Sequence, residues 1–246
     1  MEDVMTEAAP PSRFLEEDLN IFTTPSPPLP KPFLISQPHT PSLLIVALPA
    51  PSLALFRRLR SSTPAASLLL PELPLSRPNH TADLFALSPS ALLAAVPFPV
   101  PAHRAHALAR ALLSARMAPR SVLLLDSLQP PNFRGSLSSD ETLAFKLETS
   151  AERKSADAEK MLPGVPYYPS GSVVDGLGAA ILARCQVLNV RASLCVSWPR
   201  FDASVVSLVK GLLQRGVLRG FEFDLGDEDL KFGRSEDRVL HSELYI

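Results

Sequence analysis

Residues 103–126, HRAHALARALLSARMAPRSVLLLD, indicate the fold, because a helical pattern is followed directly by a buried strand. In residues 103–117 alanine and leucine dominate, and Leu108 and Leu112 share one stripe, as in an amphipathic helix that covers a sheet. Residues 121–126 form a continuous apolar run that ends in an acid, which is typical of a strand buried on both faces. The stretch therefore predicts a helix and a central strand of an α/β sheet.

The same two patterns recur on both sides of this stretch. Strands are expected at residues 43–48, 143–147 and 192–198, and helices at 173–185 and 203–214. Ser170 or Ser172 is expected to cap the helix at 173–185. Short apolar runs between prolines, at 67–70, 84–87 and 91–96, are interpreted as edge strands and loops. The alternation of strand and helix predicts an α/β fold, a three-layer sandwich with a mostly parallel sheet and right-handed crossovers.

The composition divides the chain into three parts. Residues 1–41 hold nine of the 26 prolines and are predicted to be a disordered, proline-rich leader. Residues 42–220 are predicted to form the α/β domain. Residues 221–246 are acidic and lack apolar periodicity, so they are predicted to be a flexible tail.

Charge and cysteine content exclude several classes of function. With 24 basic and 25 acidic residues the net charge is −1, so no general field attracts nucleic acid or an anionic membrane. The most apolar run, residues 42–56, is interrupted by Pro49 and Pro51 and is too short to span a bilayer. Cys185 and Cys195 lie in apolar segments and are expected to be buried, reduced thiols. We expect a cytoplasmic protein, with the nucleus or the ER surface as alternatives.

Candidate catalytic residues stand where strands or helices of an α/β fold end or begin. Asp126 and Ser127 follow one predicted strand, Trp198 ends another, and Ser172 precedes a helix; Asp175 is interpreted as a first-turn acid of that helix. Ser172 is preceded by Tyr167-Tyr168-Pro169 and not by a strand, so capping explains it better than a role as nucleophile. The glycines of residues 171–178 lack a Walker lysine and the dinucleotide spacing. His103 and His106 lack a third ligand. The sequence therefore predicts no catalytic residue, no metal and no cofactor.

Residues Leu244, Tyr245 and Ile246 form a different kind of candidate site. An apolar residue, a tyrosine and a terminal carboxylate at the end of an acidic segment can together fill a pocket, stack and pair with a lysine. We expect this segment to dock on a partner protein.

Four stretches resemble one family closely enough to suggest it. These are SVLLLDSLQPPNFRG (121–135), LAFKLETSAERK (143–154), YYPSGSVVDGLGAAILARCQV (167–187) and LCVSWPRFDASVVSLVKGLL (194–213). They resemble the plant form of the proteasome assembly chaperone 1 family, as does the leader segment SRFLEEDLN (12–20). Residues 64–101 depart from that pattern.

The resemblance implies a non-enzymatic chaperone with a fold similar to a nucleoside phosphorylase. It implies a heterodimer with proteasome assembly chaperone 2 that binds the α-subunit ring of the nascent 20S proteasome and promotes its assembly. It also implies that Leu244, Tyr245 and Ile246 dock in a pocket between neighbouring α subunits.

Two other functions stay open at this point. One is a nucleoside- or phosphate-binding enzyme on the same fold, in which Ser172 or Asp126 would line a closed pocket. The other is a proline-rich adaptor, in which residues 25–32 would bind the partner.

Overall fold

The computed structural model describes residues 29–36, 41–48, 51–56, 64–73, 81–114, 117–138, 140–200 and 202–219. The chain divides into two compact units, Met1–Pro30 and Lys31–Ile246. Since only residues 29 and 30 of the first unit are described, the fold below is that of the second. The predicted tail, residues 221–246, lies outside the described residues, as does most of the predicted leader.

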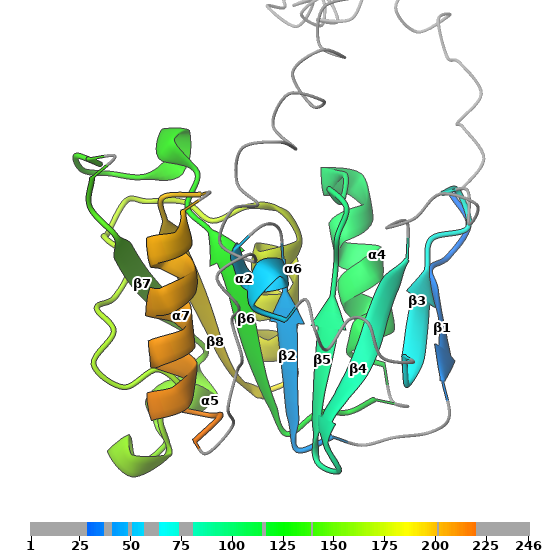
Figure 1. Ribbon diagram of the computed structural model, residues 1–246. Helices are drawn as coiled ribbons and strands as arrows, with labels where there is room; N and C mark the ends of the chain where they lie inside the picture. Colours follow the sequence, from blue (N-terminus) through cyan, green and yellow to red (C-terminus); the bar gives the residue numbers. More distant parts are fainter. Residues whose placement is uncertain are drawn as a thin grey trace, which may run out of the picture. The chain divides into compact units, whose positions relative to one another are not determined.

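One mixed sheet forms the middle of this unit (Figure 1). Its strands are β1 (Phe33–Ser36), β2 (Leu43–Ala47), β3 (Ala66–Leu69), β4 (Ala82–Ser88), β5 (Ala91–Ala95), β6 (Ser121–Ser127), β7 (Leu143–Glu148) and β8 (Arg191–Trp198). The strand order is β1-β3-β4-β5-β2-β6-β8-β7. The three apolar runs at 67–70, 84–87 and 91–96 fall largely in the strands β3, β4 and β5. The expectation that they are edge strands and loops was wrong, since all three strands lie in the interior of the sheet.

Parallel pairing, which the sequence predicted for most of the sheet, is confined to its centre. β2 pairs in parallel with β5 and with β6, and β6 pairs in parallel with β8. The pairings on either side are antiparallel. Only Pro89 and Ser90 separate β4 from β5, which is far too short for a crossover, so these strands form an antiparallel hairpin. The sheet is therefore mixed.

Helices cover both faces of the sheet, which confirms the predicted α/β sandwich. On one face lie α2 (Pro51–Leu55) and α7 (Ala203–Arg215), and on the other lie α4 (Ala102–Leu112) and α6 (Gly176–Val187) (Figure 1). Side chains of β2 alternate between the two layers: Leu44 packs with the α4–α6 layer and Ile45 with the α2–α7 layer. Shorter helical segments are η1 (Pro130–Asn132), α5 (Ser150–Arg153) and η2 (Asp157–Glu159).

β5 lies in the interior of the sheet and not at its edge, where the sequence analysis placed residues 91–96. All five of its residues are buried, and it separates β2 from β4. A continuous apolar run without polar alternation is what burial on both faces requires. The prolines around this run reflect its short loops rather than an edge position.

The first strand lies within residues 1–41, which the sequence predicted to be disordered. Phe33–Ser36 pairs with β3 at the edge of the sheet. Leu34 packs against the core, while Phe33 and Ile35 on the other side are 48% and 57% exposed. Pro32 directly precedes the strand, where its missing N–H costs no sheet hydrogen bond. Residues 33–36 therefore do not belong to a disordered leader.

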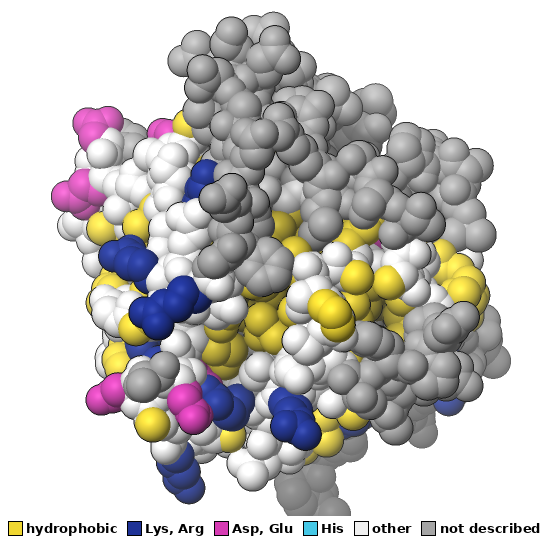
Figure 2. Space-filling model, turned by 60° about the horizontal axis from the view of Figure 1, so that its bottom comes forward, with side chains coloured by type: hydrophobic (Ala, Val, Ile, Leu, Met, Phe, Trp, Pro, Cys, Tyr) yellow, Lys and Arg dark blue, Asp and Glu magenta, His cyan; other side chains and the backbone are white. Residues whose placement is uncertain are grey.

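Apolar side chains also lie at the surface of the described part of the chain (Figure 2). Figure 2 brings the lower side of Figure 1 forward and shows hydrophobic side chains in the middle of that face, with Lys and Arg side chains mostly around them. No helix in the described part of the chain is both long and apolar enough to cross a membrane.

Candidate functional site

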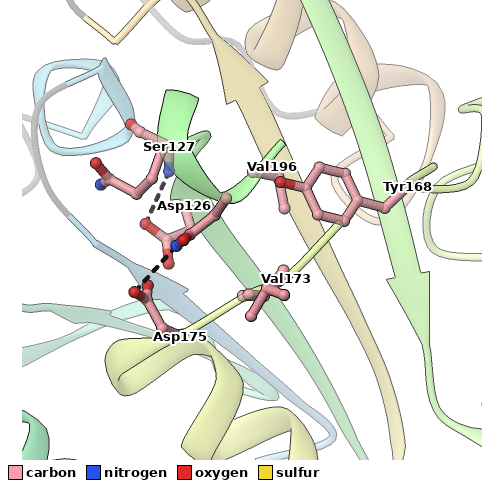
Figure 3. A pocket seen from close by; sticks show the side chains of 9 residues that line it. Asp126, Ser127, Tyr168, Val173, Asp175 and Val196 are labelled. Carbon is pink, nitrogen blue, oxygen red and sulfur yellow. Dashed lines mark hydrogen bonds between the residues drawn. The ribbon is translucent and has the colours of Figure 1, made fainter. Parts of the chain in front are cut away.

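A small pocket lies at the carboxyl end of β6, where the sequence analysis placed Asp126 and Ser127. It is lined by Asp126, Ser127, Gln129, Asn132, Tyr168, Val173, Val174, Asp175 and Val196. Figure 3 shows the two aspartates on one side of it and the Tyr168 ring across from them. Its volume of about 30 Å³ is room for roughly one water molecule. A substrate of nucleoside size does not fit this pocket as it stands.

Asp126 is the electrostatic centre of the pocket. Its Oδ1 accepts a hydrogen bond of 2.7 Å from the backbone N–H of Ser127. Burial raises the pKa of Asp126 to about 6, and the negative charge of Asp175 adds to the rise. The Ser127 N–H and the Arg200 charge act in the opposite direction without cancelling it. At neutral pH the pocket therefore carries negative charge, which does not suit a phosphate group.

Asp126 is accommodated because position 178, in the first turn of α6, is glycine. A Cβ at Gly178 would lie 2.6 Å from Asp126 Oδ2 and 3.4 Å from Leu48 Cδ1. The absence of a side chain at this position is therefore what lets the carboxylate approach the first turn of the helix.

Asp175, and neither Ser170 nor Ser172, occupies the N-cap position of α6. The backbone of Asp175 is extended, with φ −122° and ψ −171°, so the helix begins at Gly176 and not at 173 as predicted. The side chain of Asp175 makes no capping bond; instead its Oδ2 accepts a hydrogen bond of 3.0 Å from Asn132 Nδ2 (Figure 3). Ser172 Oγ accepts a hydrogen bond of 2.9 Å from the N–H of Arg134. Both side chains thus fasten the 129–134 loop to the start of α6.

The remaining candidates lie apart from this pocket. Trp198 donates its indole N–H to Ser138 O at 2.8 Å, which ties a loop to the end of β8. His103 and His106 are exposed on α4. Within the described ranges, no group of three His, Cys, Asp or Glu side chains could hold a metal ion. The structure brings together Asp126, Ser127 and Asp175, but not Ser172, Trp198 or the histidines.

Leu244, Tyr245 and Ile246, the predicted docking residues, lie outside the described residues. Cys185 and Cys195 are both buried and free, as expected. Burial raises the pKa of each thiol to about 12.

A buried polar cluster under β7 was not foreseen from the sequence. Lys146 Nζ lies 2.8 Å from Glu148 Oε1 and donates a hydrogen bond of 3.2 Å to Leu162 O. Tyr167 donates its hydroxyl to Glu148 Oε2 at 2.7 Å, and its ring centroid lies 5.0 Å from Lys146 Nζ. Burial alone would raise the pKa of Glu148, but the bonds from Lys146 and Tyr167 outweigh it and lower that pKa. Lys146, Glu148 and Tyr167 are thus paired with one another and with the backbone, and we interpret the cluster as structural.

Comparison with known proteins gives a fold but no sequence family. No model of a known protein family and no curated protein sequence matches the chain. Among solved structures, PbaA of Pyrococcus furiosus, an archaeal homologue of proteasome-assembly chaperone, is similar with a TM-score of 0.60. That alignment has 13% identity and covers 87% of this chain and 90% of PbaA.

The fold is that of PbaA. It is also that of PbaB from the same organism, an archaeal proteasome activator: the TM-score is 0.59 at 14% identity, over 87% of this chain and 98% of PbaB. A protein of unknown function from Thermoplasma acidophilum is similar to the same degree, with a TM-score of 0.59 at 13% identity over 85% and 91% of the two chains. The similarity therefore spans whole domains and is not confined to one βαβ unit.

Proposed function

We propose that the protein is a chaperone of 20S proteasome assembly. The observation that carries the proposal is the fold shared over 87% of the chain with PbaA, an archaeal homologue of proteasome-assembly chaperone. The resemblance of four sequence stretches to the plant form of proteasome assembly chaperone 1 points the same way.

In this proposal the chain works as a cytoplasmic heterodimer with proteasome assembly chaperone 2 and promotes formation of the α ring. Residues Leu244, Tyr245 and Ile246 dock in a pocket between α subunits. An apolar side chain, a phenol and a negative charge give such a segment both buried area and directional contacts. The folded domain and the second chaperone add contacts of their own, so the docking segment supplies only part of the affinity.

The pocket beside Asp126 supports a non-enzymatic role. Its volume of about 30 Å³ leaves no room for a nucleoside, and among the described residues that line it none is basic or a histidine. A hydrolase would need a base beside its nucleophile, and a phosphate site would need donors or positive charge.

Binding of recombinant 20S α subunits to the tagged chain, co-expressed with proteasome assembly chaperone 2, tests the proposal. Wild-type protein should retain α subunits, and Tyr245→Ala should weaken binding at least tenfold, whereas Tyr245→Phe should lie between the two. Each variant should unfold at the wild-type temperature. Failure of the wild-type complex to bind any α subunit would overturn the proposed function; full binding by Tyr245→Ala would overturn only the docking role.

The second candidate function is that of a proteasome activator. PbaB, an archaeal proteasome activator, is as similar to this chain as PbaA, with TM-scores of 0.59 and 0.60. The two functions differ in their target. An activator raises peptide hydrolysis by the mature 20S particle, whereas an assembly chaperone acts on incomplete rings and leaves the mature activity unchanged. A peptidase assay with and without the chain separates them.

The enzyme alternative has its own test. A nucleoside- or phosphate-binding enzyme would be stabilised by its ligand, so the unfolding temperature should rise in a series of nucleosides and inorganic phosphate. We expect no rise with any of them.

A further inference from the structure

Helix α6 is apolar around most of its circumference. Its sequence, GLGAAILARCQV, contains only two polar side chains, Arg184 and Gln186. Leu177, Ile181 and Cys185 point into the core between α6 and the sheet. A helix that is apolar all round is typically covered on all sides, unlike the amphipathic helix of a free surface.

The outer side of α6 is nevertheless uncovered. Ala183 is exposed, Val187 is 79% exposed, and Leu188, which follows the helix, is 43% exposed. Gly176, Ala183 and Val187 share one stripe, since helical residues seven and eleven positions apart lie on the same side. Gln186, the polar residue of the outer side, is already bonded to Ser150 through both its amide atoms.

This stripe borders a groove between α4 and α6. The groove has a volume of about 330 Å³ and is lined by Ala102, Ala105, His106, Asp175, Gly176, Ala179, Ala180 and Ala183. Because these side chains are small, a helix of another chain can approach both α4 and α6 at close interaxial distance and fill the groove with larger apolar side chains. We call the groove and Val187 together the α4–α6 groove.

The charges beside the α4–α6 groove select the occupant. The Arg184 Nε is buried without a hydrogen-bond partner, and none of the described carboxylates forms an ion pair with this guanidinium. Arg110 is exposed on α4. Asp175 is the one acid among the described lining residues, and it already accepts a hydrogen bond from Asn132. A second copy of this face would bring more arginine, so the complementary surface is one that carries carboxylates.

We propose that the α4–α6 groove binds a helix of a different protein chain, with a ridge of large apolar side chains and an Asp or Glu that pairs with Arg184. The proposal rests on the proposed function, in which the chain has a heteromeric partner, and it identifies the surface on which that partner docks. Arg184, which is half-buried, gains an acidic partner on binding, and Val187 loses its exposure. The ion pair adds a directional contact to the apolar area of the groove.

The test is the affinity of proteasome assembly chaperone 2 for variants of this chain, measured by titration calorimetry. Ala183→Asp places a charge in the groove and should weaken binding at least tenfold. Arg184→Glu should weaken it by a similar factor, and Arg184→Lys should lie between. The matched control is Ser207→Asp, at an exposed position of α7 on the opposite face, which should bind within twofold of wild type. Unfolding temperatures verify that each variant is folded.

Three results would overturn the proposal. Wild-type affinity of Ala183→Asp and Arg184→Glu would place the interface elsewhere. If the wild-type chain forms no complex with that chaperone, the proposed partner of this face is wrong. A homodimer that Ala183→Asp dissociates would make the occupant a second copy. Binding of α subunits by the same variants is measured in parallel, and a failure of the proposed function would appear there as loss of α-subunit binding by the wild type.

Discussion

Gly178 and Asp126 share one small space, since a Cβ at Gly178 would lie 2.6 Å from Asp126 Oδ2. Gly178→Ala should therefore destabilise the protein by about 1–3 kcal/mol, despite the better helix propensity of alanine. In an Asp126→Ala background the same change should be neutral or stabilise by up to about 1 kcal/mol, because the carboxylate is gone. Urea unfolding of the four proteins measures this coupling.

Gly211 supplies the control for this cycle. It lies within α7, and a Cβ at this position would meet nothing within 4 Å. Gly211→Ala should stabilise the protein by about 0.5–1 kcal/mol in both backgrounds. Equal effects of alanine at 178 and 211 would contradict the space-sharing role of Gly178.

Asp126 should give the stability a pH dependence of its own. Its pKa is 3.8 unperturbed and about 6 in the folded protein, so the folded state binds the proton more tightly. Below pH 3.8 the carboxyl is protonated in both states and carries no penalty. Between about 4 and 6 stability falls as the pH rises, by at most about 2–3 kcal/mol, and above 6 the penalty is constant.

Asp126→Asn isolates this effect, because the amide oxygen can still accept the Ser127 N–H. The variant should be more stable than wild type at pH 7.5 and equal to it near pH 3.5. The free energy of unfolding of both proteins, measured across this range, provides the comparison. A difference that stays constant from pH 4 to 7 would show that the carboxyl does not titrate as described.

Lys146 and Glu148 should depend on each other. Both are buried, at 7% and 5% exposure, so removing either charge leaves the other without its partner. Lys146→Met or Glu148→Gln should cost about 3–5 kcal/mol. The double variant Lys146→Met, Glu148→Leu should cost less than the sum of the single changes. Lys154→Met, at an exposed position, serves as the control and should change stability by less than about 0.5 kcal/mol.

Thr149, which caps α5, and Ser170, which the sequence analysis offered as a cap of α6, should respond differently to loss of their hydroxyl groups. Thr149 is 1% exposed, accepts hydrogen bonds from the N–H groups of Glu152 and Ala192, and donates one to Val190 O. Thr149→Ala should cost about 1–3 kcal/mol. Ser170→Ala should cost less than about 0.5 kcal/mol, because Ser170 is exposed and Asp175 holds the N-cap position of α6. Chemical denaturation midpoints would reveal a reversed order.

Continuous apolar runs predicted the strands well. Residues 43–48 and 121–126 lie in the centre of the sheet, where burial on both faces leaves no choice of residue type. The helix at 203–214 was equally clear, since its stripe of valine and leucine faces a strand layer and Asp202 caps it. These signals are local, which is why a single sequence contains them.

The buried charges of β7 and the arrangement of the Asp126 pocket depend on contacts between distant segments, which the sequence pattern does not show. Alternation of apolar residues with Lys146 and Glu148 indicates a half-exposed strand with its charged side outward, yet these two are the buried residues of β7. A lysine and a glutamate that neutralise each other can lie inside, and no pattern within six residues reveals this. Asp126 was singled out correctly, but its proximity to Asp175 depends on how the 129–134 loop meets α6.

The two cysteines lie on opposite faces of the sheet, Cys185 in the α4–α6 layer and Cys195 in the α2–α7 layer. Since both thiols are buried, a thiol-reactive reagent can modify each only after its own layer has opened. The alkylation rate of Cys185 therefore reports the opening of the α4–α6 layer, and the rate of Cys195 reports the opening of the α2–α7 layer. A ligand that holds α6 against the sheet should slow the alkylation of Cys185 and leave that of Cys195 unchanged.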